Sequence, residues 1–164
     1  MDVLFIIDRL ELKYFEFNNL VTNFWIIREL LRSNVNVFIA TIDNLSIVGG
    51  VAFAHCYKVY ANDENIFYDK NLNSVKIENF RLVIFRPDPP VDVDYINATY
   101  IFDFVDREKT LLLNDPYSIR NFNEKLHALK FLNLMPQNIV TSSKADIIDF
   151  LNMHEEIVLK PLNG

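Results

Sequence analysis

Two charged residues follow a buried-type apolar run and are held between prolines. The run RLVIF at residues 81–85 leads directly into Arg86-Pro87-Asp88-Pro89-Pro90. Proline lacks an N–H and restricts the residue before it, so this segment must leave the strand as a stiff loop. A rigid loop that presents a guanidinium group suits an anionic ligand. The alternative is a proline-stiffened turn that carries a surface ion pair.

A bound anion would explain why two lysines occupy their positions in the sequence. Lys125 follows Asn123 and Glu124 near a predicted helix start, where it could meet a phosphate, although a solvated helix face is the usual explanation. Lys160 interrupts the apolar run IVLKPL at residues 157–162. Burying a lysine without a partner is costly, so either an anionic ligand or an edge position with the ammonium in water is required.

The remaining reactive residue types predict no chemistry. Cys56 is the one cysteine and lies in an apolar alternating run beside His55, so we predict a structural thiol and a reducing compartment. His55, His127 and His154 lack the spacing of metal ligands. We therefore expect neither a cysteine nucleophile nor a histidine metal site.

Apolar runs and helical patterns alternate through the first two thirds of the chain. This order predicts an α/β fold with a mainly parallel sheet flanked by helices. Ligands bind such sheets at the carboxyl ends of the strands, so Asp8 and residues 86–90 should share one edge. The expected strands are 3–7, 35–41, 81–85 and 111–113, and the expected helices are 20–31 and 95–105.

Other segments depart from this alternation. Residues 45–60 predict a hairpin around Gly49-Gly50, followed by a mobile polar loop at 61–73 and a short strand at 74–78. After Pro116 the pattern changes, which places a boundary between a domain at 1–118 and a second one at 119–164. The second is expected to contain helices at 121–132 and 143–151, with Ser143 opening the latter, and strands at 138–141 and 157–162.

Composition narrows the classes of partner and location. The net charge is -6 and no cluster of Lys and Arg occurs, which argues against a nucleic-acid partner. No apolar run approaches the roughly 20 residues that a spanning helix needs. The first residues have neither a basic region nor a small-residue cleavage site, so they do not predict a signal peptide. We expect a cytoplasmic protein with no membrane contact.

Taken in order and spacing, four segments resemble the bacterial glutathione synthetases, a family of ATP-grasp ligases. They are RPDPP (86–90), NATYIFD (97–103), LLLNDPYSIRNFNEKL (111–126) and LKPLNG (159–164). The resemblance covers the whole chain and is strongest from residue 81 onward. It implies a Rossmann-like pre-ATP-grasp domain, which binds substrate, followed by the beginning of an ATP-grasp lid subdomain.

The resemblance also implies a reaction and roles for particular residues. The family joins γ-glutamylcysteine to glycine with ATP and Mg²⁺ through an acyl phosphate. Lys125 and Lys160 match the two lysines that contact ATP, and Arg86 matches an arginine of the substrate-facing loop. Asp88 and Thr99 would support that loop. No catalytic residue and no metal ligand is expected in this chain, and self-association into a homo-oligomer is expected.

The chain departs from the family pattern in several places. Phe17-Asn18-Asn19-Leu20 replaces a Lys-Asp-Ser-like stretch that helps to form the tripeptide site, and Pro87 stands where a basic residue is frequent. The family's glycine-rich phosphate loop would begin at Asn163-Gly164 and continue further, so this chain alone is expected to lack ligase activity. Two alternatives therefore remain: an ATP-grasp ligase with a different acid substrate, and a non-catalytic binding or assembly module.

Overall fold

The computed structural model describes residues 1–15, 20–62 and 65–164 and divides into two compact units. The first unit is Met1–Asn121 and the second is Phe122–Gly164. Of the stretch 17–20, in which the sequence departs from the family, residues 17–19 lie outside the described part of the chain. The domain boundary between 118 and 119 stays a prediction.

The first unit is built on one mixed β-sheet whose centre is parallel. Its strands follow the order β3-β4-β2-β1-β7-β8, with β5 and β6 paired to β4. β1 pairs in parallel with β2 and β7, and β7 pairs in parallel with β8. The predicted α/β class is thus confirmed. The strands are β1 (Asp2–Ile6), β2 (Asn36–Ala40), β3 (Leu45–Val48), β4 (Val51–Asn62), β5 (Asn65–Tyr68), β6 (Asn73–Lys76), β7 (Leu82–Phe85) and β8 (Leu111–Leu113).

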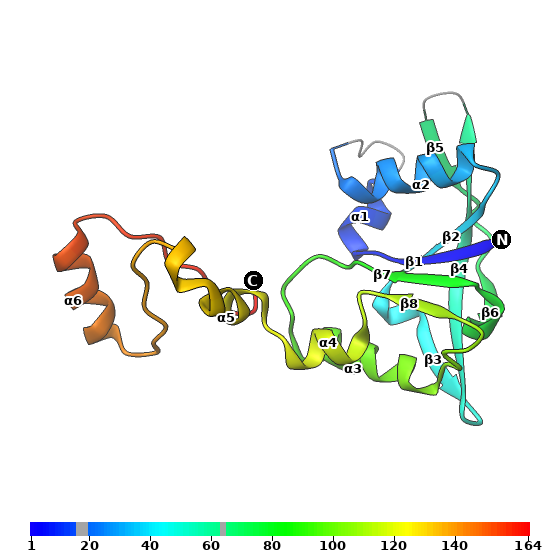
Figure 1. Cartoon of the computed structure of the whole chain (residues 1–164). Coiled ribbons are helices and arrows are strands. Elements are labelled where there is room, and N and C mark those ends of the chain that lie inside the picture. Colours follow the sequence, from blue (N-terminus) through cyan, green and yellow to red (C-terminus); the bar gives the residue numbers. More distant parts are fainter. Residues whose placement is uncertain (16–19, 63–64) are drawn as a thin grey trace. The chain divides into compact units, whose positions relative to one another are not determined.

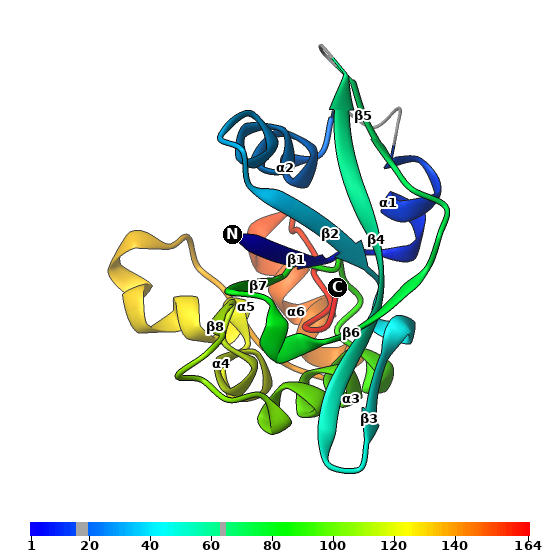
Figure 2. The ribbon, with the colours of Figure 1, turned by 90° about the vertical axis from the view of Figure 1, so that its right-hand side faces the viewer.

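The long strand β4 organises the antiparallel part of the sheet. One end of β4 pairs with β3 as the predicted hairpin, and the other end pairs with β5 (Figure 2). The prediction of a loop over 61–73 is wrong where β5 forms. Ile66 is fully buried and Tyr68 half-buried, whereas Phe67 between them is exposed. This period of two supports a strand within an otherwise polar segment.

Helices cover both faces of the parallel strands. Helices α1 (Arg9–Lys13) and α2 (Thr22–Arg32) lie on one side, and α3 (Val93–Ile101) and α4 (Pro116–Asn121) on the other (Figure 1). Helix α1 was not predicted, because a five-residue helix shows too little periodicity. Its start is set by Asp8, whose carboxylate accepts a hydrogen bond from the Leu10 amide at 2.6 Å.

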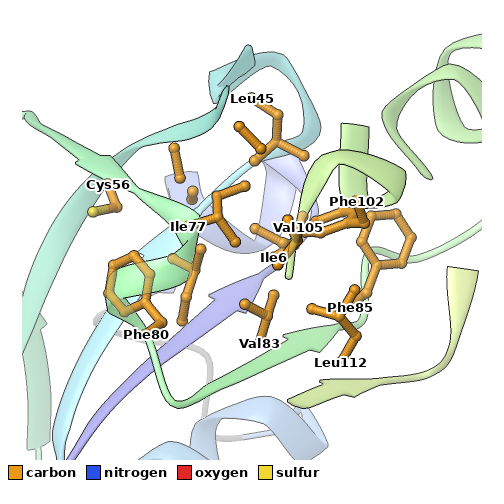
Figure 3. Packing of buried hydrophobic residues seen from close by; sticks show 14 of the residues in the cluster. Ile6, Leu45, Cys56, Ile77, Phe80, Val83, Phe85, Phe102, Val105 and Leu112 are labelled. Atoms are coloured by element: carbon orange, nitrogen blue, oxygen red, sulfur yellow. The ribbon is translucent and has the colours of Figure 1, made fainter. Parts of the chain in front are cut away.

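Alternate residues of β1 pack into two separate cores. Val3 and Phe5 join the cluster that contains Ile27 of α2. Leu4 and Ile6 join the opposite cluster, which contains Ala98 of α3 and the aromatic rings drawn in Figure 3. Because neighbouring side chains of a strand point to opposite faces, one short apolar run supplies both cores and fixes the strand register.

The second unit is mainly helical. It contains α5 (Glu124–Ala128), a 3₁₀ segment η5 (Leu129–Leu134) and α6 (Lys144–His154), so the predicted helix over 121–132 is divided. Ser143 caps α6 as predicted, because its hydroxyl accepts from the Asp146 amide at 3.3 Å. The predicted strands at 138–141 and 157–162 are wrong. Residues 122–164 contain no strand, and a lone extended segment has no neighbour for its backbone groups.

Candidate functional site

Four loops leave the parallel strands at one edge of the sheet. Asp8 follows β1, Thr41 follows β2, Arg86 follows β7 and Asn114 follows β8. The common edge predicted for Asp8 and residues 86–90 is confirmed, since both line the same pocket. This is the edge at which open α/β sheets bind ligands.

The pocket at this edge is small and rich in carboxylates. Its volume is about 160 Å³. Two of its carboxylates are already engaged as helix caps, because Asp8 accepts from Leu10 and Asp92 accepts from the Tyr95 amide at 2.9 Å. The lining residues are Ile7, Asp8, Arg9, Ile42, Pro87, Asp88, Pro90, Asp92, Asp94 and Tyr95. The pocket therefore favours a positively charged or hydrogen-bond-donating group of a ligand.

An ion pair between Arg9 and Asp43 joins the start of α1, which follows β1, to the 3₁₀ turn at 42–44, which follows β2. The Arg9 guanidinium donates two hydrogen bonds to the Asp43 carboxylate. Both side chains are substantially exposed, so the pair orients the helix start and the turn more than it stabilises the fold. Sequence reasoning missed both residues, although each stands within three positions of a strand end.

The backbone at the start of the proline loop is held by a bond to the β1 backbone and by side chains from distant segments. The Arg86 amide donates to the Ile6 carbonyl at 2.8 Å, which extends the pairing of β7 with β1. The Asn114 amide group donates to the Phe85 carbonyl at 2.9 Å, and Asn23 Nδ2 lies 3.5 Å from the Arg86 carbonyl oxygen. The Arg86 side chain itself is exposed. A fixed backbone with an exposed guanidinium suits the binding of an anion.

A buried carboxyl group lies behind this loop. Glu11 is 4% exposed, and its Oε2 accepts from Asn23 Nδ2 at 2.9 Å. Its Oε1 has no hydrogen-bond partner among the described residues. Burial raises the pKa of Glu11, the Asp88 and Asp8 carboxylates raise it further, and the Asn23 hydrogen bond and Arg86 oppose the change.

We predict that Glu11→Gln stabilises the protein at neutral pH. The raised pKa means that the folded state binds the Glu11 proton more tightly than the unfolded state. Stability from this group is therefore complete below its ordinary pKa of 4.5 and is lost as the pH rises through the raised value. Glutamine carries no charge and still accepts from Asn23, so the free energy of unfolding should rise by about 1 kcal/mol at pH 7.

Urea unfolding at pH 4 and at pH 7 measures the difference in the free energy of unfolding between Glu11→Gln and the wild type. Glu29→Gln is the matched control, because Glu29 is exposed and pairs with Arg32 on the surface of α2. A Glu11→Gln protein that is equally or less stable than the wild type at pH 7 would contradict a raised pKa of Glu11 in the folded state.

Thr99 and Asp88, the two predicted supports of the loop, lie in different surroundings. Thr99 is buried in α3, where its hydroxyl donates to the Ile96 carbonyl at 2.6 Å and accepts from Arg120 at 3.3 Å. The bond from Arg120 joins α4 to α3, whereas the bond to Ile96 lies within α3. Asp88 is exposed and lines the pocket. The supporting role of both residues stays a prediction.

In the second unit, Lys125 and Lys160 differ in exposure. The Lys125 side chain is 23% exposed, and its ammonium donates to the Gly164 carbonyl and lies 3.4 Å from Glu124. Lys160 is exposed in a segment without regular structure. The residue that fixes the start of α5 is Asn123, whose Oδ1 accepts from the Lys125 and Leu126 amides. Sequence reasoning did not assign a role to Asn123.

Two expectations about reactive residues can be compared with the structure. Cys56 is fully buried, burial raises the pKa of its thiol to about 11, and its sulfur lies 3.7 Å from the Asn73 carbonyl oxygen. The thiol is thus structural, as expected. Within the described ranges, no three acidic, histidine or cysteine side chains are grouped so that they could hold a metal ion.

Comparison with known proteins decides the family. The N-terminal domain model of prokaryotic glutathione synthetase matches residues 1–120, and the ATP-grasp domain model of the same enzymes matches residues 124–164. The chain belongs to the prokaryotic glutathione synthetase family. The family suggested by the four sequence segments is therefore confirmed.

Curated glutathione synthetases extend the family match across most of the chain. The protein named glutathione synthetase in Salmonella typhi is 33% identical over 148 residues, which cover 87% of this chain and 46% of that protein. Its counterpart in Escherichia coli (strain K12) is 32% identical with the same coverage. A cyanobacterial glutathione synthetase, from Thermosynechococcus vestitus, is 46% identical over 88 residues, which are 54% of this chain and 28% of that protein.

The chain spans about half the length of the curated relatives that match most of it. None of the helices in its described ranges has the length and apolar character needed to cross a bilayer.

Proposed function

We propose that the natural protein is an ATP-dependent ligase that joins γ-glutamylcysteine to glycine. The observation that carries this proposal is the match of both family domains, in order, over residues 1–120 and 124–164. The geometry of the sheet edge supports it, since a fixed loop presents Arg86 beside a pocket rich in carboxylates. A γ-glutamyl dipeptide carries both carboxylates and an ammonium group, which these two features would bind.

Within this proposal each predicted site residue of the first unit has a defined task. The Arg86 guanidinium binds a carboxylate of the acid substrate, because charge-assisted hydrogen bonds from arginine to carboxylate are strong and directional. Asp88 lies at the pocket and accepts from a donor group of the substrate or of the loop. Thr99 acts indirectly, by holding α3 against α4 through Arg120.

Lys125 and Lys160 would neutralise the charge of the ATP phosphates from the second unit. Two ammonium groups, one half-buried and one exposed, fit the charge of a polyphosphate. ATP supplies the phosphoryl group that activates the substrate carboxylate. The described residues of this chain offer no cluster that fits Mg²⁺, so we assign it no ligand here. We also propose a cytoplasmic location. We propose that the protein forms a homo-oligomer, and light scattering of the purified protein would test the oligomeric state.

The proposal is tested by the reaction of the natural full-length protein with defined acid–amine pairs. ADP formation should depend on γ-glutamylcysteine and glycine together. A second candidate, a ligase for a different acid, is favoured by the sequence at 17–20 and predicts ADP formation with another pair instead. A protein that forms ADP with neither would overturn the ligase assignment.

A further inference from the structure

One side-chain amide in the second unit joins two segments that are 39 residues apart. Asn123 caps α5, where its Oδ1 accepts from the Lys125 amide at 3.0 Å and from the Leu126 amide at 3.2 Å. The same side chain donates from Nδ2 to the Leu162 carbonyl at 2.7 Å. The cap of the helix and the end of the lysine-containing segment are thus held by one group.

This bond matters because the segment it holds has no regular structure. Residues 156–160 lie in neither a helix nor a strand, and 161–164 contain only a turn. Their backbone therefore lacks a ladder of hydrogen bonds, and its position depends on side-chain bonds such as the one from Asn123. Lys125, at the second position of the capped helix, donates to the Gly164 carbonyl and so reaches the same segment.

We infer that Asn123 is a positioning residue of the nucleotide site. It holds residues 160–164 against the start of α5, so that the ammonium groups of Lys125 and Lys160 are presented to one polyphosphate. Asn123 does not itself contact the nucleotide. The inference rests on the proposed function, because it assumes that these two lysines bind ATP.

Two substitutions separate this role from helix capping. Asn123→Asp and Asn123→Ser both keep an oxygen that can cap α5, and both remove the Nδ2 donor. The serine variant adds no charge, so it distinguishes loss of the bond from repulsion of phosphate. Asn138→Asp is the matched control, because Asn138 Nδ2 also donates to a backbone carbonyl in the same unit, that of Pro136 at 2.9 Å.

Nuclear magnetic resonance on the ¹⁵N-labelled 164-residue chain tests the bond itself. Both Asn123 variants should shift the Asn163 amide, which shares a peptide group with the Leu162 carbonyl, and should increase the motion of residues 162–164. The amides of Lys125 and Leu126 should stay protected from exchange. Unchanged signals at 162–164, or loss of protection at the helix cap alone, would overturn the inference.

Kinetics of the natural full-length protein test the consequence. Both Asn123 variants should raise the KM for ATP by about 5- to 10-fold, the effect of one lost hydrogen bond, with the KM for the acid substrate unchanged. Asn138→Asp should leave both unchanged. A rise seen with aspartate and absent with serine would overturn the inference. A wild-type protein without ATP-dependent ligase activity would overturn the proposed function and, with it, the nucleotide role of Asn123.

Discussion

Replacing Arg86 by alanine in the natural full-length protein should raise the KM for the acid substrate by about 10- to 100-fold. The Arg86 backbone is fixed by the Ile6 carbonyl, and its side chain is exposed. Alanine removes the guanidinium and leaves these backbone bonds in place, so the folded structure should persist. Steady-state kinetics with varied acid substrate measure the change, and thermal unfolding of the same sample reports the fold.

The control for Arg86 is an arginine of similar exposure that lies elsewhere. Arg32 pairs with Glu29 at the carboxyl end of α2, away from the strand ends that form the pocket. Arg32→Ala should leave the KM for both the acid and ATP unchanged. Equal effects of the two substitutions, or a KM for the acid that Arg86→Ala does not change, would contradict a substrate role for the proline loop.

Replacing Phe102 by alanine should lower the free energy of unfolding by about 3–5 kcal/mol, the largest stability effect that we expect. Phe102 is fully buried in the cluster of Figure 3. Its ring lies edge-on to Phe85, with centroids 5.6 Å apart, and Phe85 contacts Tyr95 in the same way at 5.2 Å. Alanine would leave a cavity in the centre of this aromatic group, directly beside the strand end that carries Arg86.

Phe104 provides a matched control for this substitution, because it lies two residues further along the same 3₁₀ turn and is 50% exposed. Phe104→Ala should cost less than about 1 kcal/mol, since a half-exposed ring loses little buried area. Chemical denaturation of the three proteins measures both values. Similar losses for Phe102→Ala and Phe104→Ala would contradict the packing described for this core.

The parallel centre of the sheet could be predicted from sequence, because apolar runs such as 3–7 and 81–85 are long enough to be buried on both faces. The inference of a strand from an apolar run failed for 157–162, because no neighbouring strand is present in residues 122–164. It failed in the opposite sense for β5, whose buried Ile66 lies in a polar stretch. A strand depends on its partner as much as on its own residues.

Only part of the candidate site could be predicted from sequence. Asp8 and Arg86 could be predicted, because each directly follows a strand and position in the chain suffices to place them at one edge. Asn23 and Asn114 could not, since the carbonyl groups that they bind lie 63 and 29 residues away in the chain. Glu11 was missed for the same reason, because its burial depends on contacts with α2 that no local pattern reveals.

We propose that the carboxyl edge of the sheet binds the acid substrate through the loop at 86–90. Titration of the ¹⁵N-labelled chain with γ-glutamylcysteine, monitored by amide chemical shifts, measures this binding directly. We expect saturable shifts at Arg86 and Asp88 and at the pocket residues Asp8 and Arg9, all of which should be lost in Arg86→Ala. Shifts confined to other parts of the chain, or saturable shifts that persist in Arg86→Ala, would contradict it.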